Sequence, residues 1–151
     1  GMDEPFPARF DQQGTIDYTP WLATVDVITG LEDRIGWDAI RAYIDTLLNY
    51  STDIVADALD AASGEESRVD VGAPAPGMRL LRLPGTLGAT GPEAQALRQR
   101  ITDTLGFETQ ITNWRDTGYL RLAAHAYNTA DDYERFAEDV VPTLVNWSRE
   151  G

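Results

Sequence analysis

The spacing of apolar residues predicts a chain that mixes helices with short strands, and the last helix has the clearest pattern. From Tyr133 to Leu144, apolar residues recur every three or four positions, as on the buried face of a helix. Thr129 and Asp132 form a capping box at its start, with aspartate in place of the usual glutamate. Pro142 predicts a kink, because proline has no amide hydrogen to donate.

Three earlier helices are predicted. The first begins at Thr19, where a hydroxyl cap is followed by Pro20, and it ends by Gly36. The second covers residues 37–63, with apolar residues on roughly one face. The third covers residues 92–106 and ends at a glycine.

Alternating patterns predict the strands. Residues 78–83 form a short strand, and residues 107–114 and 119–127 alternate with a period of two. Turn residues at 116–118 join the last two strands into a hairpin. The glycine- and proline-rich segment 63–77 is predicted to be a surface loop. We therefore expect an α+β fold, in which helices pack on one face of a small antiparallel sheet of about three strands.

Length and composition set the broad class. The chain has 151 residues, which suits one domain (residues 18–151) preceded by an extended arm (residues 1–17). Its net charge is −13, from 25 acidic and 12 basic residues, which argues against nucleic acid and anionic membranes as partners. Without cysteine there are no disulfides and no thiolate metal sites. We expect a cytoplasmic protein.

One predicted strand carries candidate binding residues. Alternation places Arg121 and His125 on one face, together with Tyr119 and Tyr127, while Leu120 and its alternating neighbours point to the core. The planar guanidinium of arginine suits a carboxylate. The alternative is that this face is the ordinary solvent-exposed side of an antiparallel sheet.

The segment Arg121-Leu-Ala-Ala-His125-Ala-Tyr127-Asn128-Thr129 resembles the ending of the class V aminotransferase family of pyridoxal-phosphate (PLP) enzymes. The isopenicillin N epimerase-like and cysteine desulfurase-like members are the most similar. The resemblance implies that Arg121 binds the α-carboxylate of an amino-acid substrate, and we take His125 as a second substrate-binding candidate. Relatives commonly have serine where this chain has Ala123. For the Tyr-Asn-Thr segment itself, strand exit and helix capping are the expected roles.

A second segment, Gln13-Gly14-Thr15, resembles the Gly-Thr segment of the same family. The resemblance implies that Gly14 and Thr15 contact the PLP phosphate, often in the site of the partner subunit. The alternative is a loop of ordinary turn residues. Together the two matches imply that nearly the whole chain is the small C-terminal domain of a fold type I PLP enzyme.

The chain contains no lysine, since all 12 basic residues are arginine. PLP enzymes hold their cofactor as a Schiff base on a lysine amine, so we expect no activity and no PLP for this chain alone. The expected partner is a PLP-binding large domain or a second copy of the chain. The intact enzyme would be an epimerase or aminotransferase (an isomerase or a transferase) acting on an amino acid. The alternative is a free-standing binding or oligomerisation module, or a relic of a truncated gene.

Overall fold

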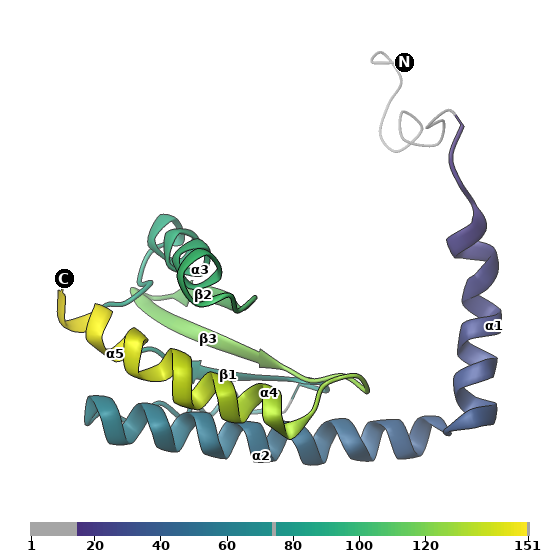
Figure 1. The fold of residues 1–151 in the computed structure, drawn as a ribbon, viewed down its shortest axis with the longest axis horizontal. Helices are drawn as coiled ribbons and strands as arrows, with labels where there is room; N and C mark the ends of the chain where they lie inside the picture. Colours follow the sequence, from purple (N-terminus) through teal and green to yellow (C-terminus); the bar gives the residue numbers. More distant parts are fainter. Residues whose placement is uncertain (1–14, 74, 151) are drawn as a thin grey trace. The chain divides into compact units, whose positions relative to one another are not determined.

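The computed structural model describes residues 15–73 and 75–150. These residues belong to two units, which are divided after Ala39. The second unit combines a three-stranded sheet with helices, which confirms the predicted α+β class. In chain order (Figure 1), the described elements are α1 (Thr19–Arg34), α2 (Trp37–Ser63), β1 (Met78–Arg82), α3 (Gly91–Leu105), β2 (Gln110–Trp114), β3 (Thr117–Ala123), α4 (Ala130–Arg135), the π-helical turn η2 (Phe136–Val140) and α5 (Val141–Glu150).

Helix α1 has nearly the predicted range but a different start. Tyr18 is the N-cap residue, and its side chain makes no capping bond. The amide of Thr19 instead donates to Asp17 Oδ1 at 2.9 Å. A carboxylate satisfies an unpaired amide at the positive end of a helix. The predicted hydroxyl cap at Thr19 was therefore wrong.

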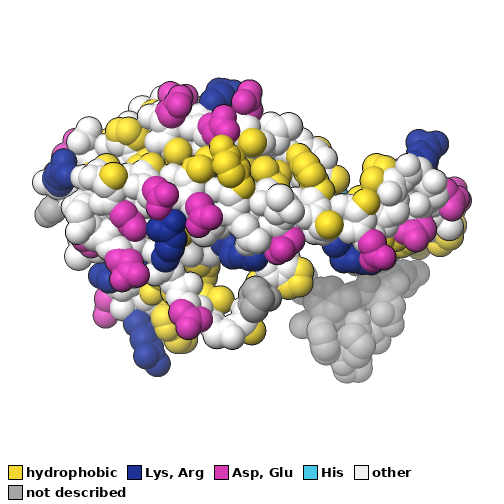
Figure 2. All heavy atoms as spheres, turned by 90° about the horizontal axis from the view of Figure 1, so that it is seen from below, with side chains coloured by type: hydrophobic (Ala, Val, Ile, Leu, Met, Phe, Trp, Pro, Cys, Tyr) yellow, Lys and Arg dark blue, Asp and Glu magenta, His cyan; other side chains and the backbone are white. Residues whose placement is uncertain are grey.

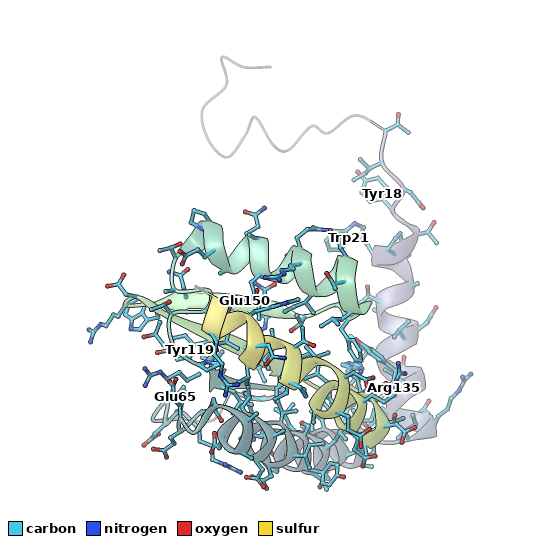
Figure 3. The ribbon with its side chains drawn as sticks, turned by 60° about the vertical axis from the view of Figure 1, so that its left-hand side comes forward. Tyr18, Trp21, Glu65, Tyr119, Arg135 and Glu150 are labelled. Carbon is cyan, nitrogen blue, oxygen red and sulfur yellow. The ribbon has the colours of Figure 1, made fainter. Side chains whose placement is uncertain are left out.

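No residue of α1 is buried, although its sequence is typical of a core helix. Asp26 is the only charged residue between Thr19 and Leu31. Trp21 and Leu22 are 73% and 77% exposed, and Figure 3 labels Trp21 on the helix. A helix that is apolar around most of its circumference is normally buried. Helix α1 thus carries a large apolar surface that its own unit does not cover.

In the second unit, β3 is the central strand of the sheet. The order is β1-β3-β2, and both neighbours run antiparallel to β3. The hairpin turn consists of Arg115 and Asp116, with φ of 46° and 58°, because Trp114 pairs with Thr117. Positive φ at both residues is what a two-residue turn between twisted strands requires. The turn predicted at 116–118 was therefore too late in the sequence.

Gly118, which was assigned to that turn, is a buried residue of β3. The amide of Leu83 donates to its carbonyl oxygen at 2.9 Å, which continues the pairing of β1 with β3. A Cβ atom at this position would collide with the backbone carbonyl of Leu87. Only glycine allows the two backbones to approach this closely.

The helices of the second unit cover one face of the sheet, as predicted. Helix α2 and the final helix, α4–η2–α5, run side by side along the sheet (Figure 1). Tyr50 of α2 donates a hydrogen bond to Glu134 of α4 at 2.5 Å, which ties the two helices together. The core below the sheet includes fully buried leucine, isoleucine and valine side chains from every layer: Val55, Leu59, Leu81, Ile101, Leu120, Val140 and Leu144.

The capping box at the start of the final helix is confirmed. The side chains and backbones of Thr129 and Asp132 satisfy each other reciprocally. Instead of a simple kink at Pro142, the helix contains the π-helical turn η2 immediately before the proline. In this turn the amide of Val141 donates to Phe136, five residues back. Such wide turns are a known means of interrupting the regular ladder of helical hydrogen bonds.

Two predicted strands are shorter in the structure. Phe107 lies before β2, not within it, and its ring meets Phe136 edge-on at 5.7 Å between centroids. Strand β3 ends at Ala123, and the chain then turns so that the amide of Asn128 donates to His125 at 3.0 Å. The alternation predicted to continue to Tyr127 therefore stops four residues early.

The loop between α2 and β1 is held against α2 by one arginine. The guanidinium of Arg68 lies 2.7 Å from Asp57, 3.3 Å from Asp53 and 3.5 Å from Asp60, which are one helical turn apart on α2. Backbone contacts extend the attachment to β1, because Arg68 forms an isolated antiparallel bridge with Leu81. This part of the loop thus lies along the outer edge of β1.

Acidic side chains are spread widely over the surface. On the face shown in Figure 2, arginines lie among acidic and apolar side chains and form no continuous basic stripe. Among the described residues, no helix is long and apolar enough to cross a membrane.

Candidate functional site

The sheet face opposite the helices carries the candidate site. Cross-strand pairing places Leu80 of β1, Arg121 of β3 and Gln110 of β2 in one row. The next row contains Tyr119 and Thr112. Because Leu120 and Leu122 are buried on the other face, alternation turns Arg121 away from the core, as predicted. This uncovered face is therefore the surface on which Arg121 is available to a ligand.

Arg121 is exposed and forms no ion pair with any residue that the structure describes. Arg82 and Arg98 also have no ion pair among the described residues, so Arg121 is distinguished by its place in the site. By contrast, Arg79 pairs with Asp45 at 3.2 Å and Arg68 contacts three carboxylates. The guanidinium of Arg121 thus keeps its donors free for a carboxylate from outside the described chain.

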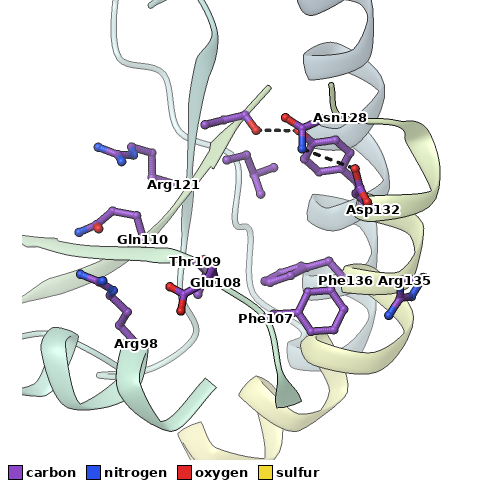
Figure 4. Close-up of a pocket in the computed structure, with 13 residues that line it drawn as sticks. Arg98, Phe107, Glu108, Thr109, Gln110, Arg121, Asn128, Asp132, Arg135 and Phe136 are labelled. Carbon is purple, nitrogen blue, oxygen red and sulfur yellow. Dashed lines mark hydrogen bonds between the residues drawn. The ribbon is translucent and has the colours of Figure 1, made fainter. Parts of the chain in front are cut away.

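Two depressions in the structure are each lined by both Arg121 and Gln110. The first, the polar hollow, has a volume of about 440 Å³ and is also lined by Arg98, Glu108 and Arg135. In Figure 4, Arg98, Gln110 and Arg121 extend in the same direction from three different elements. The carboxylates of Glu108 and Asp132 line the same hollow, so its donors and acceptors are mixed.

The second depression, the apolar groove, has a volume of about 690 Å³. Its apolar walls are Val69 and Val71 from the loop and Met78 and Leu80 from β1. Arg121 and Gln110 line it as well. The free guanidinium is thus placed where a polar and an apolar surface meet.

Aromatic residues support the floor of the polar hollow. The hydroxyl of Tyr133 donates to the carbonyl oxygen of Ala123 at 2.6 Å, at the end of β3. Burial of this side chain raises the pKa of Tyr133, and the negative charge of Asp132 adds to the effect. The tyrosine is therefore neutral at physiological pH and fixes the position at which the strand carrying Arg121 ends.

The Tyr-Asn-Thr segment has the structural role expected for it. The side-chain oxygen of Asn128 accepts from the amide of His125 at 3.0 Å. The amide of Thr129 donates to Asp132 at 2.9 Å. These contacts close the turn after β3 and cap α4, so they orient the strand exit next to the hollow.

His125 does not share a depression with Arg121. Because β3 ends at Ala123, its imidazole lies beyond the strand and stacks on Tyr127, with centroids 4.9 Å apart. It lines a separate depression of about 430 Å³ together with Arg79. The prediction that His125 and Arg121 lie on one strand face was therefore wrong.

The predicted phosphate-binding residues belong to the first unit. Gly14 lies outside the described residues, and Thr15 is an exposed residue before α1. No residue of the chain can form the lysine Schiff base that PLP enzymes use, because the chain has no lysine. The residues present therefore do not fit covalent attachment of PLP. Among the described residues, no group of three or more His, Asp or Glu side chains is placed to hold a metal ion.

Several residues of the site were not singled out in the sequence. Gln110 could not be identified from the sequence, because its position beside Arg121 depends on the register between β2 and β3. The turn at Arg115 and Asp116 sets that register. Arg98 is brought to the same hollow from α3. Val71 reaches the groove only because the preceding loop residues are attached to α2.

Comparison with known proteins gives two matches of different kinds, while no family model matches the chain. The chain is similar in sequence to isopenicillin N epimerase from Streptomyces clavuligerus, with 27% identity over 130 residues. That match covers 86% of this chain and 30% of the relative. In structure, the chain is similar to 8-amino-7-oxononanoate synthase from Francisella tularensis, with a TM-score of 0.57 and 14% identity.

The structural match covers 95% of this chain and 38% of the synthase. At this identity it supports the fold alone, and it agrees with the small α+β fold predicted from the sequence. The chain thus spans about a third of the length of both proteins that it matches. It is similar to part of an epimerase in sequence and to part of a larger enzyme in fold.

Proposed function

We propose that this chain is the small C-terminal domain of a PLP-dependent enzyme of the isopenicillin N epimerase-like group, which acts on an amino acid. A large domain supplies the lysine and holds the cofactor. The sequence similarity to isopenicillin N epimerase and the partial coverage of both relatives support this proposal. The chain by itself has no catalytic residue.

Arg121 binds the α-carboxylate of the substrate. The single observation that carries this assignment is that its guanidinium, without a carboxylate partner among the described residues, lines both depressions at the uncovered sheet face. Gln110, directly opposite on β2, adds an amide that can hydrogen-bond to the same ligand. Two parallel N–H···O bonds from one guanidinium fix both the position and the orientation of a carboxylate.

The assignment of Thr15 to the cofactor phosphate is the second part of the proposal. Its hydroxyl is a suitable donor, and it is exposed. His125 is proposed only as a lesser substrate contact, because its depression is shared with Arg79 and not with Arg121.

A hybrid enzyme tests the role of Arg121. This chain replaces the matching segment of isopenicillin N epimerase, and turnover is compared with that of Arg121→Ala and Arg121→Lys. Losing a charge-assisted pair costs about 2–4 kcal/mol, roughly a thirty- to thousand-fold fall in kcat/KM. Lysine should rescue little, because a point charge lacks the bidentate geometry.

Arg82→Ala is the matched control, since Arg82 is an exposed arginine on the same sheet face but lines neither the polar hollow nor the apolar groove. This control should keep its activity. An active hybrid in which Arg121→Ala resembles Arg82→Ala would show that Arg121 is only a surface residue.

A second candidate function, a non-enzymatic oligomerisation module, is favoured by one observation. Helix α1 exposes an apolar surface that its own unit does not cover. Association of copies through this surface without any ligand binding at Arg121 would support the module over the enzyme domain.

A further inference from the structure

The apolar groove has a defined wall on each side. Met78 and Leu80 alternate along β1 on the uncovered face, so both side chains face the same way. Opposite them, Val69 and Val71 alternate with Asp70, whose carboxylate accepts from the amide of Gly72 at 2.7 Å. The polar residue therefore serves the turn, while both valines line the groove.

The loop wall is held in place independently of any ligand. Arg68, directly before Val69, contacts three carboxylates on α2, and the carbonyl of Ser67 accepts from the amide of Arg82 at 2.7 Å. The amide of Ser67 in turn donates to Asp60 at 2.8 Å. The groove is thus a built feature of the second unit.

The exposure of the groove residues has no structural explanation within the described chain. Val71 is 55% exposed and Met78 is 40% exposed, although both are apolar. The volume of about 690 Å³ lies in the range of small-molecule sites. Four charged side chains line the groove. Asp53 and Arg68 pair with each other at 3.3 Å and Arg79 pairs with Asp45 at 3.2 Å, whereas Arg121 has no ion-pair partner among the described residues. Charge complementarity therefore calls for a ligand with one anionic end and an apolar body.

We propose that the apolar groove and Arg121 form a binding site for carboxylates with an apolar chain, so that the substrate is an amino acid with an apolar side chain. The carboxylate binds Arg121, and the chain lies between Val69 and Val71 on one side and Met78 and Leu80 on the other. This inference rests on the proposed function, because it uses Arg121 as the carboxylate anchor. It adds the part of the site that selects the side chain.

Nuclear magnetic resonance titrations of the full chain test the proposal, with hexanoate, acetate and hexanamide as probes. Hexanoate should shift the backbone amides of Val69, Val71, Leu80 and Arg121. Acetate should bind more weakly, by about fourfold for each methylene that hexanoate buries. Hexanamide should also bind more weakly, because it lacks the charge that a guanidinium prefers.

Three variants separate the two parts of the site. Val71→Asn and Leu80→Asn should reduce the preference for hexanoate over acetate, and Val71 is exposed enough that folding should not depend on it. Arg121→Gln should make hexanoate and hexanamide bind alike. Arg82→Gln, on the same face outside both depressions, should change neither preference.

The outcomes distinguish this inference from the proposed function. If Arg121→Gln weakens hexanoate but neither asparagine variant alters its preference over acetate, the groove is not the chain-binding site, while the carboxylate anchor stands. If Arg121→Gln binds hexanoate with unchanged affinity and still prefers it to acetate, Arg121 does not bind the carboxylate. The proposal would be overturned if hexanoate caused no saturable shift, or if it shifted amides outside the groove. It would also be overturned if the groove amides shifted with protein concentration in the absence of ligand, because the groove would then be a contact between copies of the chain.

Discussion

Gln110 and Arg121 are direct partners across β2 and β3, and both side chains line the polar hollow and the apolar groove. The pairing depends on the tight turn at Arg115 and Asp116, because a shift of one residue would turn Gln110 to the other face. The hairpin turn thus determines which residues line the site as well as how β2 and β3 pair.

The absence of lysine predicts that the isolated chain forms no PLP Schiff base on a side chain. After mixing with PLP and reduction with borohydride, mass spectrometry should find no adduct except at the α-amino group. The variant Arg82→Lys supplies one amine and serves as a positive control for the reduction. A stoichiometric adduct mapped to a side chain of the unchanged protein would contradict the prediction.

The apolar surface of α1 predicts self-association that increases with salt. Copies of charge −13 repel one another, and added salt screens this repulsion but leaves apolar contacts in place. Sedimentation velocity should show larger species as the ionic strength rises. Replacing Leu22 and Val25, which are 77% and 67% exposed, by glutamine should abolish the increase, whereas Thr24→Gln should not. A protein that stays monomeric at every salt concentration would count against the prediction.

Gly118→Ala should destabilise the second unit, because the new methyl group would collide with the backbone carbonyl of Leu87. Overpacking of this kind costs about 1–3 kcal/mol, which urea denaturation can measure. Gly91→Ala is the control, since its Cβ would meet only Asn113 at an ordinary distance of 3.9 Å. Equal stability of both variants would mean that the loop over β3 moves aside freely.

Tyr50 predicts a loss of stability at alkaline pH. Its hydrogen bond to Glu134 raises the pKa of its hydroxyl above the ordinary value of 10.0. The neutral form is thus favoured in the fold. This contribution is fully present below about pH 10 and is lost as the pH rises through the higher folded-state pKa.

Absorbance titration of tyrosinate, with Tyr50→Phe to identify the signal, should show that Glu134→Gln lowers the pKa of Tyr50. Glu138→Gln, which removes an exposed carboxylate from η2, should leave it unchanged. If both variants titrate like the unchanged protein, the hydrogen bond between Tyr50 and Glu134 does not raise the pKa of Tyr50.

Sequence patterns predicted the elements well where interactions between nearby residues determine the structure. Helix α2 has the predicted range, and the capping box of Thr129 and Asp132 is present. The alternation of Leu120, Arg121 and Leu122 correctly predicted which face carries the guanidinium. In each case the signal lies within a few adjacent residues.

The features that sequence patterns missed depend on contacts between different elements of the fold. The end of β3 at Ala123 is fixed by Tyr133, which bonds to that residue from the final helix. The need for glycine at position 118 comes from Leu87 of the loop after β1, whose backbone lies against it. The groove requires Arg68 to contact Asp57 and Asp53, which lie 11 and 15 residues earlier on α2. Alternation could not indicate any of these contacts.

The two walls of the apolar groove differ in stiffness. Leu80 belongs to a strand whose neighbour, Leu81, is fully buried in the core, so its position is rigid. Val69 and Val71 lie beyond the backbone bond of Ser67 to Arg82 and follow the ion pairs of Arg68. The carboxylates of Asp53 and Asp57 in those pairs are largely accessible to water, and each such pair contributes only about 0–1 kcal/mol. One side can therefore yield while the other keeps its shape. A pocket of this kind tolerates side chains of varied length and branching, so broad selectivity among apolar ligands follows from the way its loop is attached.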